Sequence, residues 1–344
     1  MRPLILAVLA SLVLVPCARA RLVYERDAGS STGYAVWSAN DDGSGAVRIA
    51  NGEAPKISPD GSLVAYSTYP AGVACGSASL RLVAASGGTD RRLLGFVSGF
   101  NGNTVWAPDS RTLAAVGLVR RSVSLVLIDA ATGAQRVLAR GLVHGVSFSP
   151  DGRSLVFARG GGKYGDEYAL WIVDRQGGRP RRLTFGRRDE WPLWGPKAIF
   201  FTRSRTLFAV SPRGAKPLAV LHRRLRRGRS LTPIGVSADG SRLVAELYGP
   251  GVDAAETVNP DTGAASNLGL GPRAVAPAAL SSDGNLILGT MPANEPVGRT
   301  SVVTIPYGGG PPSVLAQNAD EPAWSGAPVV PSASRLVGRA ACGF

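Results

Sequence analysis

A short turn motif recurs along the whole chain, and its spacing constrains the fold more than any other feature of the sequence. The clearest copies are Phe148–Gly152 (FSPDG) and Ile57–Gly61 (ISPDG), each followed by a short apolar segment. Aligned at the proline position, seven copies stand 42 to 49 residues apart, at Pro59, Pro108, Pro150, Pro196, Ala238, Ser282 and Gly326. A period of this length over seven copies is typical of propellers and solenoids.

Each copy reads as a hairpin, because proline fixes φ, aspartate bonds the backbone ahead of it and glycine accepts a positive φ. A second hairpin lies upstream of each turn, as in Leu170–Asp174, a Gly-Gly turn, and Arg181–Thr184 before Trp194. Two hairpins make four strands in one repeat, which we interpret as one propeller blade.

The repeat therefore predicts an all-β fold, a β-propeller of seven four-stranded blades, with six blades as the alternative. No segment after residue 20 shows helical periodicity. We expect residues 21–344 to form a single propeller domain.

The best-formed repeat also resembles a known family. Asp166–Asp174 (DEYALWIVD), a Gly-Gly turn, Arg182–Thr184 and Trp191–Trp194 (WPLW) follow one another as in the TolB-like propeller repeat, a WD40-like or PD40 repeat. The resemblance covers nearly all of residues 21–344, and it implies the propeller fold rather than a function. TolB itself has six blades and binds a peptidoglycan-associated lipoprotein. Because this chain has seven turns, we do not transfer that partner.

The first 20 residues are typical of a secretory signal in a bacterial protein. Arg2 is followed by an apolar segment, Leu4–Val15, that is too short to span a membrane, and Ala18-Arg19-Ala20 offers a cleavage site. We expect export to the periplasm or the exterior after cleavage near Ala20. A lipid anchor at Cys17 is the alternative, disfavoured because Pro16 replaces the small residue that such an anchor requires.

Export would leave two cysteines in an oxidising compartment, and we predict a disulfide between Cys75 and Cys342. Cys75 follows the last strand of the first blade, and Cys342 follows Arg335–Arg339, which reads as the last strand of the seventh. These two blades are neighbours once the ring closes. The alternative is that the segment Leu22–Arg26 fills this position in the seventh blade, which would displace Cys342.

The net charge of +14 comes almost entirely from arginines scattered along the chain, and only one run is dense. That run begins at His222 and contains Arg223, Arg224, Arg226, Arg227 and Arg229. Such a cluster can bind carboxylate or phosphate groups. The alternative is a solvated loop. No aromatic residue is interleaved, so nucleic acid is not an expected partner.

We identify no catalytic, metal-binding or cofactor-binding residues. The chain lacks the sequence motifs of serine hydrolases, zinc proteases and phosphate-binding loops. We interpret His144 as a hydrogen-bonded structural residue and His222 as a loop residue. Structural roles are also expected for the turn aspartates, the hairpin Asp41–Gly45, the pairs Asp166-Glu167 and Asp189-Glu190, and the tryptophans of one repeat position, Trp106, Trp194 and Trp324.

These observations favour an exported, non-catalytic propeller that binds a protein or an acidic cell-envelope component on one face of the ring. The alternative is a propeller enzyme, a lyase or a glycosidase, with carboxylates around the central channel. An acid and a base clustered at the channel would favour the enzyme, and a face rimmed by arginines would favour binding.

Overall fold

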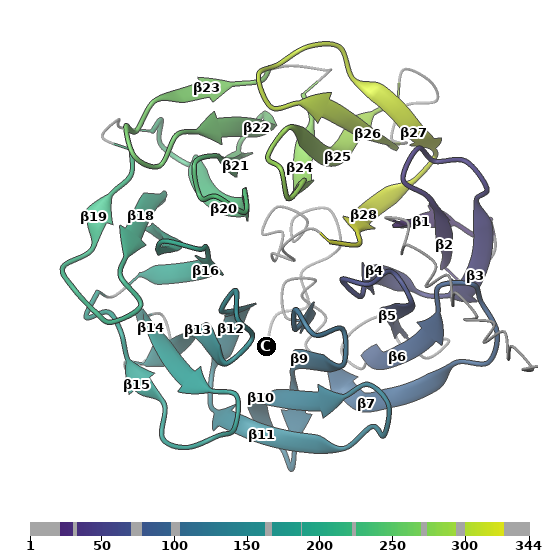
Figure 1. The fold of residues 1–344 in the computed structure, drawn as a ribbon, viewed down its shortest axis with the longest axis horizontal. Coiled ribbons are helices and arrows are strands. Elements are labelled where there is room, and N and C mark those ends of the chain that lie inside the picture. Colours follow the sequence, from purple (N-terminus) through teal and green to yellow (C-terminus); the bar gives the residue numbers. More distant parts are fainter. Residues whose placement is uncertain are drawn as a thin grey trace, which may run out of the picture.

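The fold was analysed in a computed structural model, which describes residues 21–29, 33–69, 78–97, 104–161, 167–186, 188–221, 225–269, 274–293 and 300–326. These residues contain 28 strands and no helix, so none of them forms a helix able to cross a membrane. The strands form seven four-stranded antiparallel blades arranged in a ring, which confirms the predicted propeller and its blade number (Figure 1).

Each blade runs outward from the centre of the ring in the order of its strands. Blades 1 to 3 consist of β4 (Glu53–Ile57), β5 (Leu63–Thr68), β6 (Ala78–Ala84) and β7 (Arg91–Val97); β8 (Thr104–Trp106), β9 (Thr112–Val119), β10 (Ser122–Asp129) and β11 (Gln135–Arg140); and β12 (Val143–Phe148), β13 (Ser154–Gly161), β14 (Glu167–Asp174) and β15 (Arg181–Arg182). A single pairing, Val97 with Gly117, links blades 1 and 2 into one continuous sheet.

Blades 4 to 6 follow the same plan. They consist of β16 (Asp189–Trp194), β17 (Ile199–Arg203), β18 (Thr206–Val210) and β19 (Leu218–Ala219); β20 (Ser230–Val236), β21 (Leu243–Gly249), β22 (Val252–Val258) and β23 (Ala265–Asn267); and β24 (Ala276–Leu280), β25 (Leu286–Pro292), β26 (Thr300–Pro306) and β27 (Ser313–Gln317).

Blade 7 closes the ring with strands from both ends of the described chain. Its order is β28 (Asp320–Trp324), β1 (Arg21–Asp27), β2 (Tyr34–Asn40) and β3 (Val47–Asn51). The N-terminal strand β1 takes the second position of this blade. The prediction that Leu22–Arg26 or Arg335–Arg339 would be its last strand is wrong for Leu22–Arg26, because β3 is last. Residues 327–344 lie outside the described residues, as do Cys75 and Cys17, so the Cys75–Cys342 disulfide stays a prediction.

The strand pairing corrects how the sequence grouped its hairpins. The sequence predicts that the Leu170–Thr184 hairpin belongs with the turn that follows it, at Pro196. Instead β14 pairs with β13 along its whole length, from Ser154 opposite Asp174 to Gly161 opposite Glu167. The spacing of a repeat does not show where one blade ends, because the outer hairpin is equally near two turns in the sequence.

The repeated turns have the predicted chemistry. In the turn between β12 and β13, Ser149 Oγ donates to Asp151 Oδ1 at 2.6 Å, and Asp151 Oδ1 accepts from the Arg153 amide at 3.0 Å. Asp239 and Asp283 make the same pair of bonds in their blades. The serine bond holds the pKa of all three aspartates below the usual value. The turn aspartates are therefore structural, as expected.

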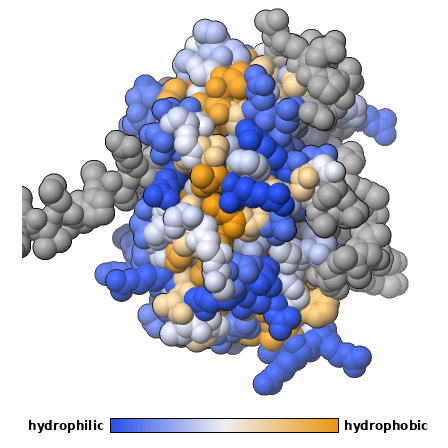
Figure 2. Space-filling model, turned by 90° about the vertical axis from the view of Figure 1, so that its right-hand side faces the viewer, coloured by the Kyte–Doolittle hydropathy of each residue, from blue (hydrophilic) through white to orange (hydrophobic). Residues whose placement is uncertain are grey.

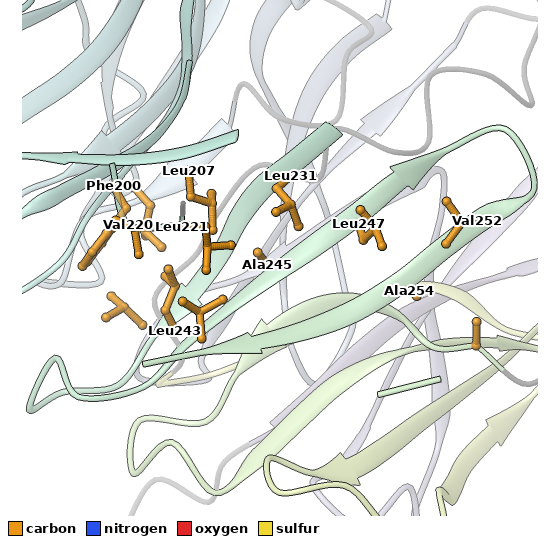
Figure 3. Packing of buried hydrophobic residues seen from close by; sticks show 14 residues of the cluster. Phe200, Leu207, Val220, Leu221, Leu231, Leu243, Ala245, Leu247, Val252 and Ala254 are labelled. Carbon is orange, nitrogen blue, oxygen red and sulfur yellow. The ribbon is translucent and has the colours of Figure 1, made fainter. Parts of the chain in front are cut away.

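The hydrophobic core lies between neighbouring blades rather than at the centre of the ring. In Figure 3, Phe200 and Leu207 of blade 4 pack with Leu231, Leu243 and Ala245 of blade 5. The same arrangement joins blades 6 and 7, where Leu22 of β1 lies in a cluster with Leu288 of β25. Trp106 is buried and donates from Nε1 to the Lys56 carbonyl oxygen of the preceding blade at 2.9 Å, as predicted for packing between blades.

Candidate functional site

The two faces of the ring carry different kinds of connection. The antiparallel order puts the turns after the first and third strands of each blade on one face, which we call the aspartate face. The links between blades and the turns after the second strands lie on the opposite face, which we call the arginine face. Among the described residues, eleven aspartates stand in or beside the turns of the aspartate face: Asp41, Asp42, Asp60, Asp90, Asp109, Asp129, Asp151, Asp174, Asp239, Asp261 and Asp283.

Some of the aspartates on the aspartate face form ion pairs with basic residues. Arg175 lies 2.6 Å from Asp109, Lys197 lies 3.7 Å from Asp261, and Arg153 lies 3.9 Å from Asp151. Ion pairs of this kind at a protein surface contribute little stability.

On the arginine face, blades 2 to 5 carry a group of arginines that we call the arginine sector. Its described members are Arg120, Arg121, Arg140, Arg188, Arg205, Arg226, Arg227 and Arg229. All are exposed except Arg229, which is half-buried. Carboxylates lie on the same face both around blades 7 and 1, where they include Asp27, Glu53 and Asp320, and within the sector, where they include Glu167, Glu190 and Asp253.

Two hairpin turns of the arginine sector hold non-glycine residues in the left-handed region. Arg120 and Arg121, between β9 and β10, have φ of 49° and 65°, and Ser204 and Arg205, between β17 and β18, have φ of 48° and 78°. Two-residue hairpin turns of this type favour Asn-Gly, because other side chains pay a steric cost there. Three of these four positions hold arginine, so the backbone of both turns is strained. Strain of this kind clusters at functional sites.

The predicted basic loop joins this sector. It links β19 to β20, and Arg226 and Arg227 are exposed there, whereas His222, Arg223 and Arg224 lie outside the described residues. The Leu231 amide donates to the Arg205 carbonyl oxygen at 2.8 Å, which fixes the end of the loop beside the β17–β18 turn. The sequence found the dense run but missed Arg188 and Arg205, which are isolated in the sequence and adjacent only in the fold.

A pocket of about 430 Å³ opens where blades 4 and 5 meet in this sector. The residues that line it are Arg188, Glu190, Thr202, Ser204, Arg205 and Ser230. Neither Arg188 nor Arg205 takes part in an ion pair within the described ranges. Burial raises the pKa of Glu190, and the charge of Asp189 adds to this, while that of Arg188 opposes it.

The neighbouring carboxylate, Asp189, has a structural role, as the sequence predicted. It is fully buried and accepts two bonds from Arg203, at 2.6 and 2.8 Å. Glu190 lines the pocket, so the structural role expected for it stays a prediction. Adjacent residues of a strand point to opposite sides, so one member of the pair is buried and the other faces the pocket.

His144 lies on β12 in an aromatic environment. Its ring centroid is 4.4 Å from that of Tyr168 and 4.9 Å from that of Trp191. Part of the residue remains accessible, but Nδ1 is buried and has no hydrogen-bond partner among the described residues, unlike the bonded histidine we expected. Burial lowers the pKa of His144 to about 4, so the imidazole is neutral near pH 7.

The structure shows no metal centre in the described part of the chain, where no three His, Cys, Asp or Glu side chains come together. The Asp41–Gly45 segment forms the β2–β3 hairpin, in which the Ser44 amide donates to Asp42 Oδ1 at 2.9 Å. Glu167 begins β14, and Asp166 lies outside the described residues.

Exposed hydrophobic residues do not mark a second site on the side of the ring formed by blade 7. Figure 2 shows that hydrophobic residues on this rim form a narrow band between hydrophilic ones. Val47 of β3 and Val314 of β27, about half exposed, are isolated examples in these strands. Scattered apolar residues of this kind are normal on protein surfaces.

Solved structures with the same fold include TolB proteins as well as a lyase and protease domains. TolB from Acinetobacter baumannii matches with a TM-score of 0.53 and 16% identity over 89% of this chain and 66% of that chain. The β-propeller domain of the Trilobed protease from Pyrococcus furiosus matches with a TM-score of 0.64 and 12% identity, over 87% and 92%. An oligogalacturonate lyase in complex with manganese matches with a TM-score of 0.56 and 18% identity, over 85% and 84%.

These similarities establish a TolB-like propeller fold and do not choose between a binding protein and an enzyme. No protein-family model matches the sequence. No curated protein sequence matches it either. The chain spans about two thirds of the Acinetobacter TolB chain.

Proposed function

We propose that this protein is an exported, non-catalytic propeller that binds an acidic protein or cell-envelope component through the arginine sector. The observation that carries the proposal is the sector itself. Arginines from four blades converge on one side of one face, and three of them stand in strained turn positions that glycine or asparagine would fill at lower cost. Their guanidinium groups can bind carboxylates or phosphates in a bidentate manner.

The proposed location rests on the first 20 residues, whose pattern is that of a signal sequence. Cleavage near Ala20 would leave Arg21 as the first residue, and β1 begins at this position. The similarity to TolB supports the same location. Mass spectrometry of protein from the exported fraction tests this part: a mature mass that starts at Arg21 is expected, and a mass that retains the leader or a lipid at Cys17 argues against it.

Binding through arginines should depend on salt, because exposed charges are screened within roughly 8 Å at physiological ionic strength. Replacing Arg223, Arg224, Arg226, Arg227 and Arg229 with serine should lower the salt concentration needed to elute the protein from an acidic matrix. If the elution salt is unchanged, the loop is not part of an anion-binding surface.

A lyase is the second candidate, because an oligogalacturonate lyase shares the fold and Glu190 lies in a pocket with two arginines. β-Elimination from a polygalacturonate chain forms a double bond that absorbs ultraviolet light. Time-dependent absorbance that disappears in Glu190→Gln would support the enzyme over the binding protein. The binding proposal expects no product.

A further inference from the structure

The pocket between blades 4 and 5 has the chemistry of a ligand site rather than of a solvated surface. Two arginines reach it from different elements, Arg188 from the link before β16 and Arg205 from the β17–β18 turn, and neither forms a salt bridge with another described residue. Its volume of about 430 Å³ lies at the small end of the usual range of ligand pockets, roughly 300–1,000 Å³. It would therefore hold one small group, such as a single sugar ring.

The charges in the pocket limit what that group can be. Arg188 and Arg205 contribute two positive charges, and Glu190 can contribute one negative charge. When Glu190 is ionised, the net charge of the pocket is therefore +1. A ligand group with one negative charge balances this net positive charge. A phosphate carries a second negative charge, which the Glu190 carboxylate would repel. Arginine pairs also match the planar carboxylate in a bidentate manner.

The remaining lining is polar and can bind hydroxyl groups. Ser204 and Ser230, which line the pocket, carry hydroxyl groups, and the Glu190 carboxylate can accept hydrogen bonds from a ligand. The Thr202 hydroxyl is already committed, because it donates to the Leu231 carbonyl oxygen at 2.8 Å. This bond ties β17 to β20 and fixes the two sides of the pocket relative to each other.

From these observations we infer that the pocket binds a sugar acid, a ring that carries one carboxylate flanked by hydroxyl groups. Arg188 and Arg205 bind the carboxylate, while Glu190, Ser204 and Ser230 bind the hydroxyls. The inference rests on the proposed function, since it assigns a subsite of the arginine sector to one unit of an acidic glycan.

Titration of the purified protein with glucuronate, followed by ligand-observed NMR, tests the site. Glucuronate should bind, and glucose should bind at least about tenfold more weakly, because a charge-assisted bond contributes roughly 1.5–3 kcal/mol. Glucose 6-phosphate should also bind more weakly. Equal or tighter binding of glucose 6-phosphate, or equal binding of glucose, would overturn the inference. So would binding of N-acetylglutamate as tight as that of glucuronate, which would indicate a protein carboxylate instead.

Two pocket variants and one control assign the binding to these residues. Arg205→Gly should weaken glucuronate binding about tenfold or more. Because glycine suits a φ of 78°, this variant keeps the turn. Glu190→Gln should strengthen the binding of glucose 6-phosphate relative to that of glucuronate, because the substitution removes the negative charge from the pocket. Arg213→Gln, at an exposed position on the aspartate face of blade 4, is the control and should leave glucuronate binding unchanged. Unchanged binding in Arg205→Gly, or equal losses in Arg205→Gly and Arg213→Gln, contradicts the site.

A failure of the pocket assignment can be distinguished from a failure of the proposed function. Retention on an acidic matrix depends on the whole arginine sector, whereas the sugar titration depends on one pocket. If the protein fails to bind glucuronate but still loses retention when the sector arginines are replaced, the pocket assignment is wrong and the proposed function stands.

Discussion

Leu22 of β1 pairs with Trp324 of β28, and this pairing closes the ring between the two ends of the described chain. Next to it, the Arg21 amide donates to Ser325 Oγ at 2.7 Å, and the Ser325 amide donates to the Arg21 carbonyl oxygen at 3.0 Å. Leu22 is fully buried, in the cluster that joins blade 7 to blade 6. Ring closure thus depends on a strand that begins at the proposed cleavage site.

The first prediction concerns this closure. Leu22→Ala should lower the free energy of unfolding by about 2–5 kcal/mol, because it removes buried methyl groups and leaves a cavity. Leu142→Ala, at a position that is 49% exposed, is the control and should change it by less than about 0.5 kcal/mol. Urea denaturation measures both. Similar small effects of the two substitutions would show that β1 does not hold the ring together.

The second prediction concerns a close contact between blades 5 and 6. A Cβ atom added to Gly235 of β20 would stand 2.6 Å from Leu280 Cβ and 2.8 Å from the Leu280 amide nitrogen. Gly235→Ala should therefore cost about 1–3 kcal/mol through overpacking. Gly95→Ala is the matched control, because nothing lies within 4 Å of the new Cβ. A melting temperature that falls equally in both would contradict this account of the interface.

The third prediction concerns pH. The folded state lowers the pKa of His144 to about 4, below the ordinary value of 6.5, so the unfolded state takes up the proton first as the pH falls. The stability that the neutral ring provides is present above pH 6.5 and declines toward pH 4. The loss between pH 7 and pH 5 should be about 2 kcal/mol. His144→Phe, which keeps an aromatic ring, should remove this dependence; an unchanged pH profile would show that another group causes it.

The fourth prediction follows from the strained turn of blade 4. Arg205→Gly should raise the free energy of unfolding by about 1 kcal/mol, because a side chain costs roughly 1–2 kcal/mol in the left-handed region. Arg205→Ala, which keeps the strain, should not stabilise the fold. A gain in stability together with a loss of glucuronate binding is the expected trade between stability and function. If glycine and alanine have the same effect on stability, the turn is not strained.

The repeat made the fold predictable, because each Pro-Asp-Gly turn is a local structure with its own bonds. Blade boundaries and ring closure were not predictable in the same way. They depend on pairings such as Leu22 with Trp324, between residues at opposite ends of the described chain. No local propensity distinguishes an N-terminal from a C-terminal strand in that position.

The candidate site was predictable only in part. A run of arginines stands out in a sequence, so the loop around Arg226 was found. Arg188, Glu190 and Arg205 come together because the link before β16 and the β17–β18 turn meet at one edge of the ring. Isolated charged residues carry no sequence signal of that meeting.

Affinity capture from a native cell-envelope fraction tests the central claim most directly. The bait proteins are the wild type, the sector variant R205S/R226S/R227S, and a control, R111S/R153S/R213S, which removes the same charge from exposed positions on the aspartate face. The account predicts that the wild type and the control retain the same acidic component and that the sector variant loses it. Equal capture by all three proteins, or equal loss in both variants, would contradict a binding surface on the arginine face.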